Sequence, residues 1–232
     1  MIDEIISEFN KNNIKIDEKT VKNLEKFNFL LIEANKLFNL TSIVEPKEVI
    51  EKHFLDSILP EKYFPKNAKC IDVGAGAGFP SVPLKIYRED LDFVMLDSLN
   101  KRVNFLNSVI SNLNLKNAVA IHSRAEDLAK NPSYREQFDV ATARAVAQLP
   151  TLCEYCLPFV KVGGYFIVYK SVNFNDEILS AENAIKILGG KIENVVQYQI
   201  NNNNRVVIII KKIKSTDKKY PRDKNKPRTN PL

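Results

Sequence analysis

Residues 72–80 read DVGAGAGFP, and this stretch decides the fold. It follows a short apolar run at 70–73 and precedes residues that can begin a helix. Glycines at 74, 76 and 78 let the backbone turn tightly and approach a ligand closely. A strand, a glycine-rich turn and a helix in this order open the nucleotide-cofactor site of open α/β sheets. We therefore predict a cofactor site here; the alternative is a glycine-rich turn that binds nothing.

The spacing of the glycines indicates which cofactor binds. The dinucleotide fingerprint G-x-G-x-x-G needs a third glycine at position 79, where this chain has Phe79. G-x-G-x-G after an acidic residue is instead typical of S-adenosylmethionine-dependent methyltransferases. We therefore predict S-adenosyl-L-methionine as the cofactor, and a nicotinamide-dependent oxidoreductase is the least favoured interpretation.

Strand and helix patterns alternate after residue 69. Short apolar runs predict strands at 70–73, 93–96, 118–121, 138–142, 165–169, 192–199 and 205–211. Helical spacing predicts helices at about 83–87, 102–113, 125–128, 146–157 and 175–188. Repeated β–α units of this kind form a mostly parallel, Rossmann-like sheet with helices on both faces. We expect a turn at Gly163–Gly164 and a closing hairpin around 201–204 that places one antiparallel strand at the edge.

The chain divides into three predicted parts. Residues 1–65 form a helical cap, in which Asp17 is an N-cap and Pro46 belongs to a first helical turn. Residues 66–212 form the Rossmann-like domain, and residues 213–232 form a basic tail. The segment 211–232 contains nine Lys and Arg residues and two Asp residues, so its charge of +7 exceeds the +6 of the whole chain. Such a tail suits a polyanion such as nucleic acid, and the alternative is a solvated tail that aids solubility.

Composition indicates the setting in which the chain works. Its 232 residues are 44% hydrophobic, and they include no apolar run of the roughly 18 residues that a membrane span needs. The acidic, amphipathic residues 1–13 do not resemble a secretory signal. Three cysteines do not make a disulfide framework. We therefore expect a cytoplasmic protein without a membrane partner.

Two further segments carry candidate cofactor residues. Asp97 ends the second predicted strand, where a carboxylate accepts hydrogen bonds from both ribose hydroxyls of a nucleoside cofactor; the alternative is a strand-end cap. Residues 123–126, Ser-Arg-Ala-Glu, follow the third strand and should lie beside the adenine. The alternative for Glu126 is that it simply starts a helix.

The segment Ala143–Arg144–Ala145 follows the fourth strand, from which methyltransferases address the methyl acceptor. The D/N-P-P-[YFW] motif of enzymes that methylate exocyclic amines is absent. Arg144 stands there instead, and a guanidinium can engage a carboxylate, a phosphate or the O6/N7 edge of guanine. The alternative is an arginine paired with an acid at a helix start.

The histidines and cysteines do not predict a metal site. His53 and His122 lack metal-ligand spacing, and Cys153 and Cys156 form a lone C-x-x-C. We expect no metal, and we expect both cysteines in the core.

Several segments together resemble one family. They are NLTSIVEP (39–46), KHFLDSILP (52–60), DVGAGAGFPSVPLKI (72–86), LDSLNKRVNFL (96–106), SRAEDL (123–128), ARAVAQL (143–149) and KYPRDKNKPRTNPL (219–232). The chain resembles the bacterial 16S ribosomal RNA (guanine-N7) methyltransferase G family, also called glucose-inhibited division protein B. The family differs from this chain in having Trp where Ala34 stands, a glycine where Ser81 stands, and a glycine-containing turn at 223–225.

The resemblance implies fold, reaction and site. It implies a class I methyltransferase fold with a helical extension, and S-adenosylmethionine-dependent methylation of guanine N7 in 16S ribosomal RNA or the small ribosomal subunit. It implies cofactor contacts at Gly74, Phe79, Ala125, Glu126 and Arg144, to which the general fold adds Asp97. Arg144 would position the cofactor or the guanine, and Asp72 or Asp97 would offset the sulfonium charge. We expect a monomer.

Two alternatives stay open at this point. One is a methyltransferase of the same fold that acts on another RNA, a protein or a small molecule, because fold does not fix substrate. The other is a non-catalytic nucleic-acid-binding protein.

Overall fold

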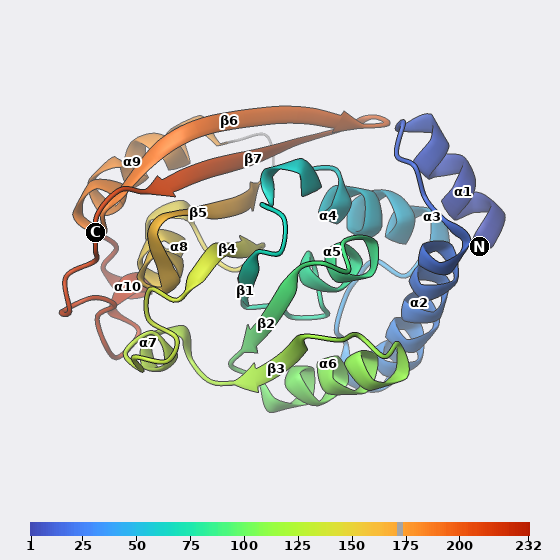
Figure 1. The fold of residues 1–232 in the computed structure, drawn as a ribbon, viewed down its shortest axis with the longest axis horizontal. Coiled ribbons are helices and arrows are strands. Elements are labelled where there is room, and N and C mark those ends of the chain that lie inside the picture. Colours follow the sequence, from blue (N-terminus) through green and yellow to red (C-terminus); the bar gives the residue numbers. More distant parts are fainter. Residues whose placement is uncertain (171–173) are drawn as a thin grey trace.

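A single twisted sheet forms the centre of the molecule (Figure 1). The computed structural model describes residues 1–170 and 174–232. Within these residues the sheet has seven strands in the order β3-β2-β1-β4-β5-β7-β6. The strands are β1 (Lys69–Val73), β2 (Asp92–Asp97), β3 (Ala118–His122), β4 (Phe138–Arg144), β5 (Val160–Lys170), β6 (Gly190–Ile200) and β7 (Asn203–Lys212). Strands β1 to β5 pair in parallel, so the predicted mostly parallel sheet is confirmed.

Helices precede, connect and follow the strands. They are α1 (Ile2–Lys11), α2 (Glu18–Phe38), α3 (Pro46–Val49), α4 (Asp56–Ile58), α5 (Ser81–Tyr87), α6 (Asn100–Asn112), α7 (Ala125–Leu128), α8 (Leu149–Cys156), α9 (Asn175–Ile187) and α10 (Lys226–Thr229). A π-helical segment, Ile50–Leu55, joins α3 to α4. The predicted cap of α2 is confirmed, since the Thr20 N–H donates to Asp17 Oδ1 at 2.7 Å. Pro46 is the first residue of α3, also as predicted.

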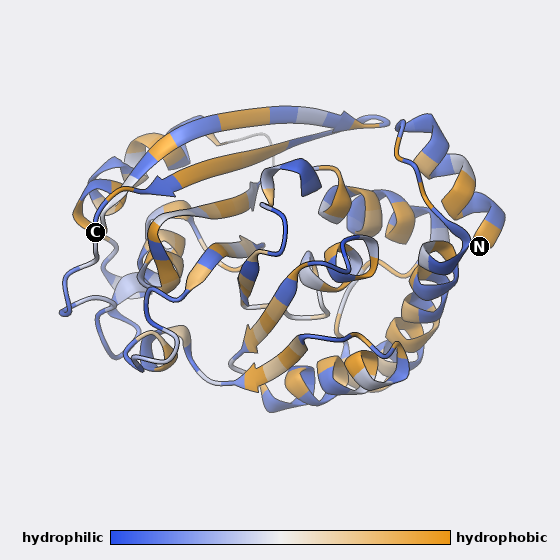
Figure 2. Ribbon diagram, in the orientation of Figure 1, coloured by the Kyte–Doolittle hydropathy of each residue, from blue (hydrophilic) through white to orange (hydrophobic). Residues whose placement is uncertain are grey.

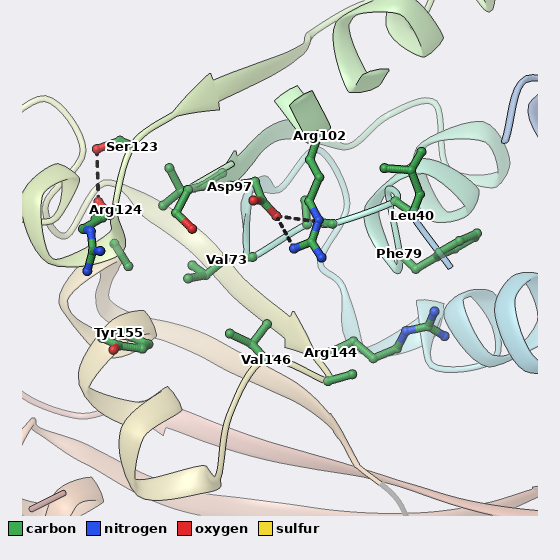
Figure 3. A pocket seen from close by; sticks show the side chains of 18 of the residues that line it. Leu40, Val73, Phe79, Asp97, Arg102, Ser123, Arg124, Arg144, Val146 and Tyr155 are labelled. Carbon is green, nitrogen blue, oxygen red and sulfur yellow. Dashed lines mark hydrogen bonds and ion pairs between the residues drawn. The ribbon is translucent and has the colours of Figure 1, made fainter. Parts of the chain in front are cut away.

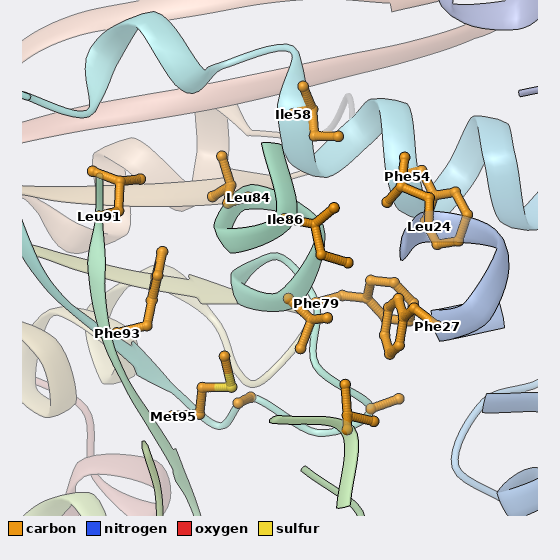
Figure 4. Packing of buried hydrophobic residues seen from close by; sticks show 14 of the residues in the cluster. Leu24, Phe27, Phe54, Ile58, Phe79, Leu84, Ile86, Leu91, Phe93 and Met95 are labelled. Atoms are coloured by element: carbon orange, nitrogen blue, oxygen red, sulfur yellow. The ribbon is translucent and has the colours of Figure 1, made fainter. Parts of the chain in front are cut away.

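The two faces of the sheet bury different sets of side chains, because successive residues of a strand point to opposite faces. Cys70 of β1 joins a cluster with the N-terminal helices, α5 and α6, whereas Ile71 joins a cluster with α7, α8 and α9. Figure 4 shows the first cluster, in which Phe79 lies against Phe27. The second cluster contains the buried thiols of Cys153 and Cys156, which confirms their predicted place in the core.

The position of the antiparallel strand differs from the prediction. The hairpin forms, but β7 inserts between β5 and β6, so the edge strand is β6 and the antiparallel strand lies inside. The hydropathy of the two strands explains this order (Figure 2). Residues 206–210 of β7 are buried on both faces, whereas β6 is mostly exposed or half-buried. A strand that is apolar on both faces belongs inside a sheet, and a polar strand suits an edge.

The predicted turn at Gly163–Gly164 is wrong. Strand β5 begins at Val160 and continues through both glycines. The register between β4 and β5 shifts there, since Phe138 pairs with Val160 and Val140 pairs with Tyr165. Gly163 has φ +90°, and a Cβ on Gly164 would lie 2.6 Å from the Asp139 carbonyl oxygen. The glycines therefore mark an irregularity inside a strand, which glycine also permits.

The C-terminal segment 213–232 packs onto the domain. Tyr220, Pro221 and Pro227 are buried, and Arg135 donates to four backbone carbonyls, of which Thr216, Asp217 and Tyr220 supply three. The alternative of a wholly solvated tail is therefore wrong. Across the described residues, none of the helices combines the length and hydropathy that crossing a membrane requires.

Candidate active site

A pocket of about 600 Å³ lies at the carboxyl ends of β1 to β4 (Figure 3). The strand order reverses there, because β1 has β2 on one side and β4 on the other. Such a switch point is where open α/β sheets bind their ligands. All six predicted cofactor residues line this one pocket, namely Gly74, Phe79, Asp97, Ala125, Glu126 and Arg144. The structure thus brings them together, and their role in binding stays a prediction.

The glycine loop forms the floor of the pocket with backbone rather than side chains. Gly74 has φ +78°, and a Cβ there would lie 2.6 Å from Val146 Cγ2. The Gly74 and Ala75 N–H groups both donate to the Leu96 carbonyl oxygen, at 2.8 and 3.0 Å. Position 74 therefore requires glycine, because a side chain there would clash with Val146 and its φ is positive.

Asp97 connects the glycine loop to the end of β2. Its side chain is 2% exposed, and it accepts hydrogen bonds from the Gly76 and Leu99 N–H groups at 2.9 Å each. Arg102 Nη1 lies 3.5 Å from Asp97 Oδ2. A carboxylate offers about four lone-pair sites, so Asp97 retains acceptor capacity for ribose hydroxyls.

The segment 123–126 forms another wall. Glu126 is buried in the first turn of α7, so both interpretations of this residue fit the structure. Tyr155 of α8 lines the same pocket, and burial raises the pKa of its hydroxyl. Sequence analysis missed Tyr155, because α8 carries no motif that points to the pocket.

Arg144 is held by a segment of the N-terminal cap. Its guanidinium donates to Asp56 Oδ2 at 2.9 Å, to the Lys52 carbonyl oxygen at 3.0 Å and to His53 Nδ1 at 2.8 Å. It also lies 5.1 Å from the centre of the Phe79 ring. Figure 3 shows the side chain extending away from Asp97. Arg144 is thus paired with an acid, as the alternative proposed, but this acid is far away in the sequence.

His53 completes this arrangement. Its ring stacks on Phe79 with 4.0 Å between ring centres, and its Nε2 lies 3.1 Å from Thr41 Oγ1. Burial, together with the charge of Arg144, lowers the pKa of His53 to about 3. The imidazole is therefore neutral at ordinary pH, and Nδ1 can accept from Arg144 while Nε2–H donates to Thr41. Sequence analysis singled out the segments 39–46 and 52–60 but assigned no role to Thr41, His53 or Asp56.

Asp72 does not line the pocket. Its side chain is fully buried, and burial raises its pKa to about 7. Within the described part of the chain, Asp72 Oδ1 and Ser81 Oγ have no hydrogen-bond partner. Of the two carboxylates expected near a sulfonium, only Asp97 faces the pocket directly.

The fold and the pocket define a class I S-adenosylmethionine-dependent methyltransferase. Solved structures share this fold. A SAM-dependent methyltransferase from Aquifex aeolicus matches with a TM-score of 0.54 and 17% identity, over 78% of this chain and 97% of that one. TYW2 from M. jannaschii, solved in complex with AdoMet, matches with a TM-score of 0.56 and 14% identity, over 74% of this chain and 80% of that one.

Sequence similarity identifies the family. The sequence model of GidB, described as rRNA small subunit methyltransferase G, matches residues 20–207. A Clostridium botulinum protein named ribosomal RNA small subunit methyltransferase G is 45% identical over 96% of this chain and 95% of its own length. A Desulforamulus reducens protein of the same name is 48% identical over 90% and 88%. The chain belongs to the rRNA small subunit methyltransferase G family, so the resemblance noted in the sequence is confirmed.

Proposed function

We propose that this protein transfers the methyl group of S-adenosylmethionine to N7 of a guanine in 16S ribosomal RNA. Family membership identifies it as an S-adenosylmethionine-dependent rRNA methyltransferase. The observation that supports the site is the convergence of the six predicted residues on one pocket at the switch point.

The residues of the pocket fit this cofactor. Asp97 has acceptor capacity for ribose hydroxyls, Ala125 and Glu126 border the position proposed for adenine, and Gly74 lines the pocket with backbone alone. When bound, the cofactor supplies an electrophilic methyl group on a positively charged sulfur. The Asp97 carboxylate offsets part of that charge, because the two charges would share a partly enclosed site.

The acceptor explains why the chain needs no general base. Guanine N7 carries an in-plane lone pair and no proton, so no proton must leave before the methyl group is transferred. Catalysis then depends on alignment and on fixed charge. Arg144 is suited to that task because three hydrogen bonds and the Phe79 ring hold its guanidinium in place. We propose that it positions the guanine or the cofactor.

The setting of the reaction belongs to the same proposal. The substrate is 16S ribosomal RNA, free or within the small ribosomal subunit, and Lys and Arg side chains contact its phosphates. The protein acts as a monomer in the cytoplasm, where bacterial ribosomes are assembled.

Transfer of a labelled methyl group tests this function. The protein is incubated with labelled S-adenosylmethionine and either free 16S ribosomal RNA or purified small subunits, and the modified base is then mapped. We expect label on N7 of one guanine. Label on protein, on a small molecule or on an exocyclic amine would overturn the proposal. Binding of RNA without any transfer would favour the non-catalytic alternative.

A further inference from the structure

The C-terminal segment is anchored to the domain by a buried ion pair. Glu154 of α8 has a side-chain exposure of 1%, and Arg222 donates to both of its carboxylate oxygens, with Nη2 at 2.7 Å from Oε2 and Nε at 2.9 Å from Oε1. The Arg222 backbone N–H also donates to Oε1 at 2.7 Å. A buried carboxylate that is bonded this fully fixes the backbone around position 222.

This anchor brings the following residues to the pocket. Thr151 Oγ1 donates to the Pro227 carbonyl oxygen at 2.8 Å, which fixes the start of α10. Asn225 and Arg228 line the pocket together with the glycine loop and Asp97. Arg228 Nη2 donates to the Val146 carbonyl oxygen at 3.1 Å. Part of the predicted basic tail is thus a wall of the active site.

Arg124, from the wall formed by residues 123–126, and Arg228, from the C-terminal wall, both line the pocket, and both are exposed. Both charges lower the pKa of the same group, the Tyr155 hydroxyl, and so oppose the burial that raises it. Within residues 1–170 and 174–232 neither of them forms an ion pair, although Glu126 lines the same pocket. The sequence has eight arginines, and the other six pair with acids or, for Arg135, bind four backbone carbonyls.

We propose that Arg124 and Arg228 together bind a phosphate group of the RNA backbone at the edge of the pocket, an inference that rests on the proposed function. Guanidinium groups suit phosphate because their planar fork matches its oxygens. The carboxylate of the cofactor is the other anion that could reach the pocket. The position proposed for adenine argues against it, because Arg124 would then lie at the adenosine end of the cofactor. Figure 3 shows Arg144 on the opposite side of the pocket from Arg124.

The test measures RNA affinity and cofactor affinity separately. Arg124→Gln, Arg228→Gln and the double variant are compared with wild type for 16S ribosomal RNA binding across a salt series, and for S-adenosylmethionine binding by calorimetry. Each single substitution should weaken RNA binding about tenfold, and the double variant should reduce the slope of log affinity against log salt by roughly 0.7, the contribution of one phosphate. Cofactor affinity should stay within about twofold of wild type, since no cofactor contact is lost.

Two further variants sharpen the result. Lys218→Gln removes one charge from the same segment outside the pocket, and it should leave the affinity nearly unchanged. Arg228→Lys should retain most of the salt slope and only part of the affinity, because it keeps the charge but loses the fork.

Three outcomes would overturn the proposal. One is wild-type RNA binding by the double variant, and another is an equal loss in Lys218→Gln, which would indicate a diffuse charge effect. The third is weaker cofactor binding with an unchanged salt slope, which would assign the pair to the cofactor carboxylate. Failure of the proposed function looks different, because the wild-type protein itself would then transfer no methyl group to 16S ribosomal RNA.

Discussion

The two sides of the pocket carry the same type of residue in opposite environments. The Arg144 guanidinium contacts Asp56, His53 and the Phe79 ring, and these contacts hold it in place. Arg124 and Arg228 are exposed and carry no acid partner within the described residues. His53 lies in the segment Ile50–Leu55 and Asp56 in α4, whereas Arg124 precedes α7 and Arg228 belongs to α10, and Figure 1 shows α4 far from α7 and α10. A guanidinium fixed by its own protein can position a reacting group, whereas a free one can bind an anion that arrives with the substrate.

The largest expected effect concerns the anchor of the C-terminal wall. Arg222→Ala leaves the Glu154 carboxylate buried without its partner, so the free energy of unfolding should fall by about 3–5 kcal/mol. Urea denaturation measures this change. As a control, the double variant Glu154→Leu/Arg222→Met removes both charges and should regain most of the loss. A fall below 1 kcal/mol for Arg222→Ala would mean that the wall is not anchored by this pair.

Next in size is the loss of turnover when Arg144 is removed. Arg144→Ala should lower kcat by about 10²–10³-fold, which is the usual cost of losing a preorganised charged donor. Asp56→Asn should lower kcat by about tenfold, because it leaves the guanidinium present but less firmly held. Single-turnover methyl transfer with saturating RNA measures both effects.

The matched control for these variants is Arg205→Gln. Arg205 contacts the same Asp56 at 3.4 Å but does not line the pocket, so kcat should change little. If Arg144→Ala retained both turnover and cofactor affinity, Arg144 would have no positioning role.

A smaller effect concerns the pH dependence of the free energy of unfolding, to which the buried groups His53 and Asp72 contribute. The pKa of folded His53 is about 3, so between pH 7 and 5 this imidazole takes up a proton only in the unfolded chain. Its contribution to the free energy of unfolding therefore falls by about 2 kcal/mol over this range. Asp72 acts in the opposite direction, because its folded pKa of about 7 favours the folded state by a similar amount as pH falls over this range. The two contributions should nearly cancel in the wild type.

Single variants separate these two contributions. His53→Asn should become more stable relative to wild type as pH falls from 7 to 5, and Asp72→Asn should become less stable. Unfolding free energies measured at each pH give the slopes, and His122→Asn, at an exposed position, is the control. Identical slopes for His53→Asn and wild type would contradict the assignment of a neutral, buried His53.

The smallest expected effect is on the exposed side. Arg124→Gln should leave the melting temperature within about 2 °C of wild type, because Arg124 is exposed and its guanidinium forms no ion pair within the described residues. Differential scanning calorimetry checks this value. The comparison variant is Arg144→Gln. An equal fall in melting temperature for Arg124→Gln and Arg144→Gln would contradict the contrast between the two sides of the pocket.

Local patterns explain why much of the fold and site could be predicted. Gly74 and Asp97 were recognisable because each follows an apolar run, and the carboxyl ends of parallel strands meet at one edge of the sheet. The cap at Asp17 depends on residues only three positions apart. By contrast, the order of β6 and β7 depends on how two strands share the apolar surface of the whole sheet.

The ion pairs between residues far apart in the sequence could not be predicted in this way. Asp56 and Arg144 are 88 positions apart, and Glu154 and Arg222 are 68 positions apart. Many acids are available to each arginine along the chain, and no local spacing selects one of them. The expected contribution of the basic tail to RNA binding was inferred from its total charge, although Arg222 neutralises a buried acid and Arg228 faces the pocket.

The class of fold, the family and the cofactor loop could all be predicted from the residue order, because glycine spacing and hydrophobic alternation are local features of the sequence. Which arginines pair with an acid, and which have no acid partner within the described residues, depends on the tertiary structure. Whether a charge is neutralised depends on what packs within about 4 Å of it, and the acids that pair with Arg144 and Arg222 lie 88 and 68 positions away in the sequence. That difference separates the wall that can position the reacting groups from the wall that can receive the RNA backbone.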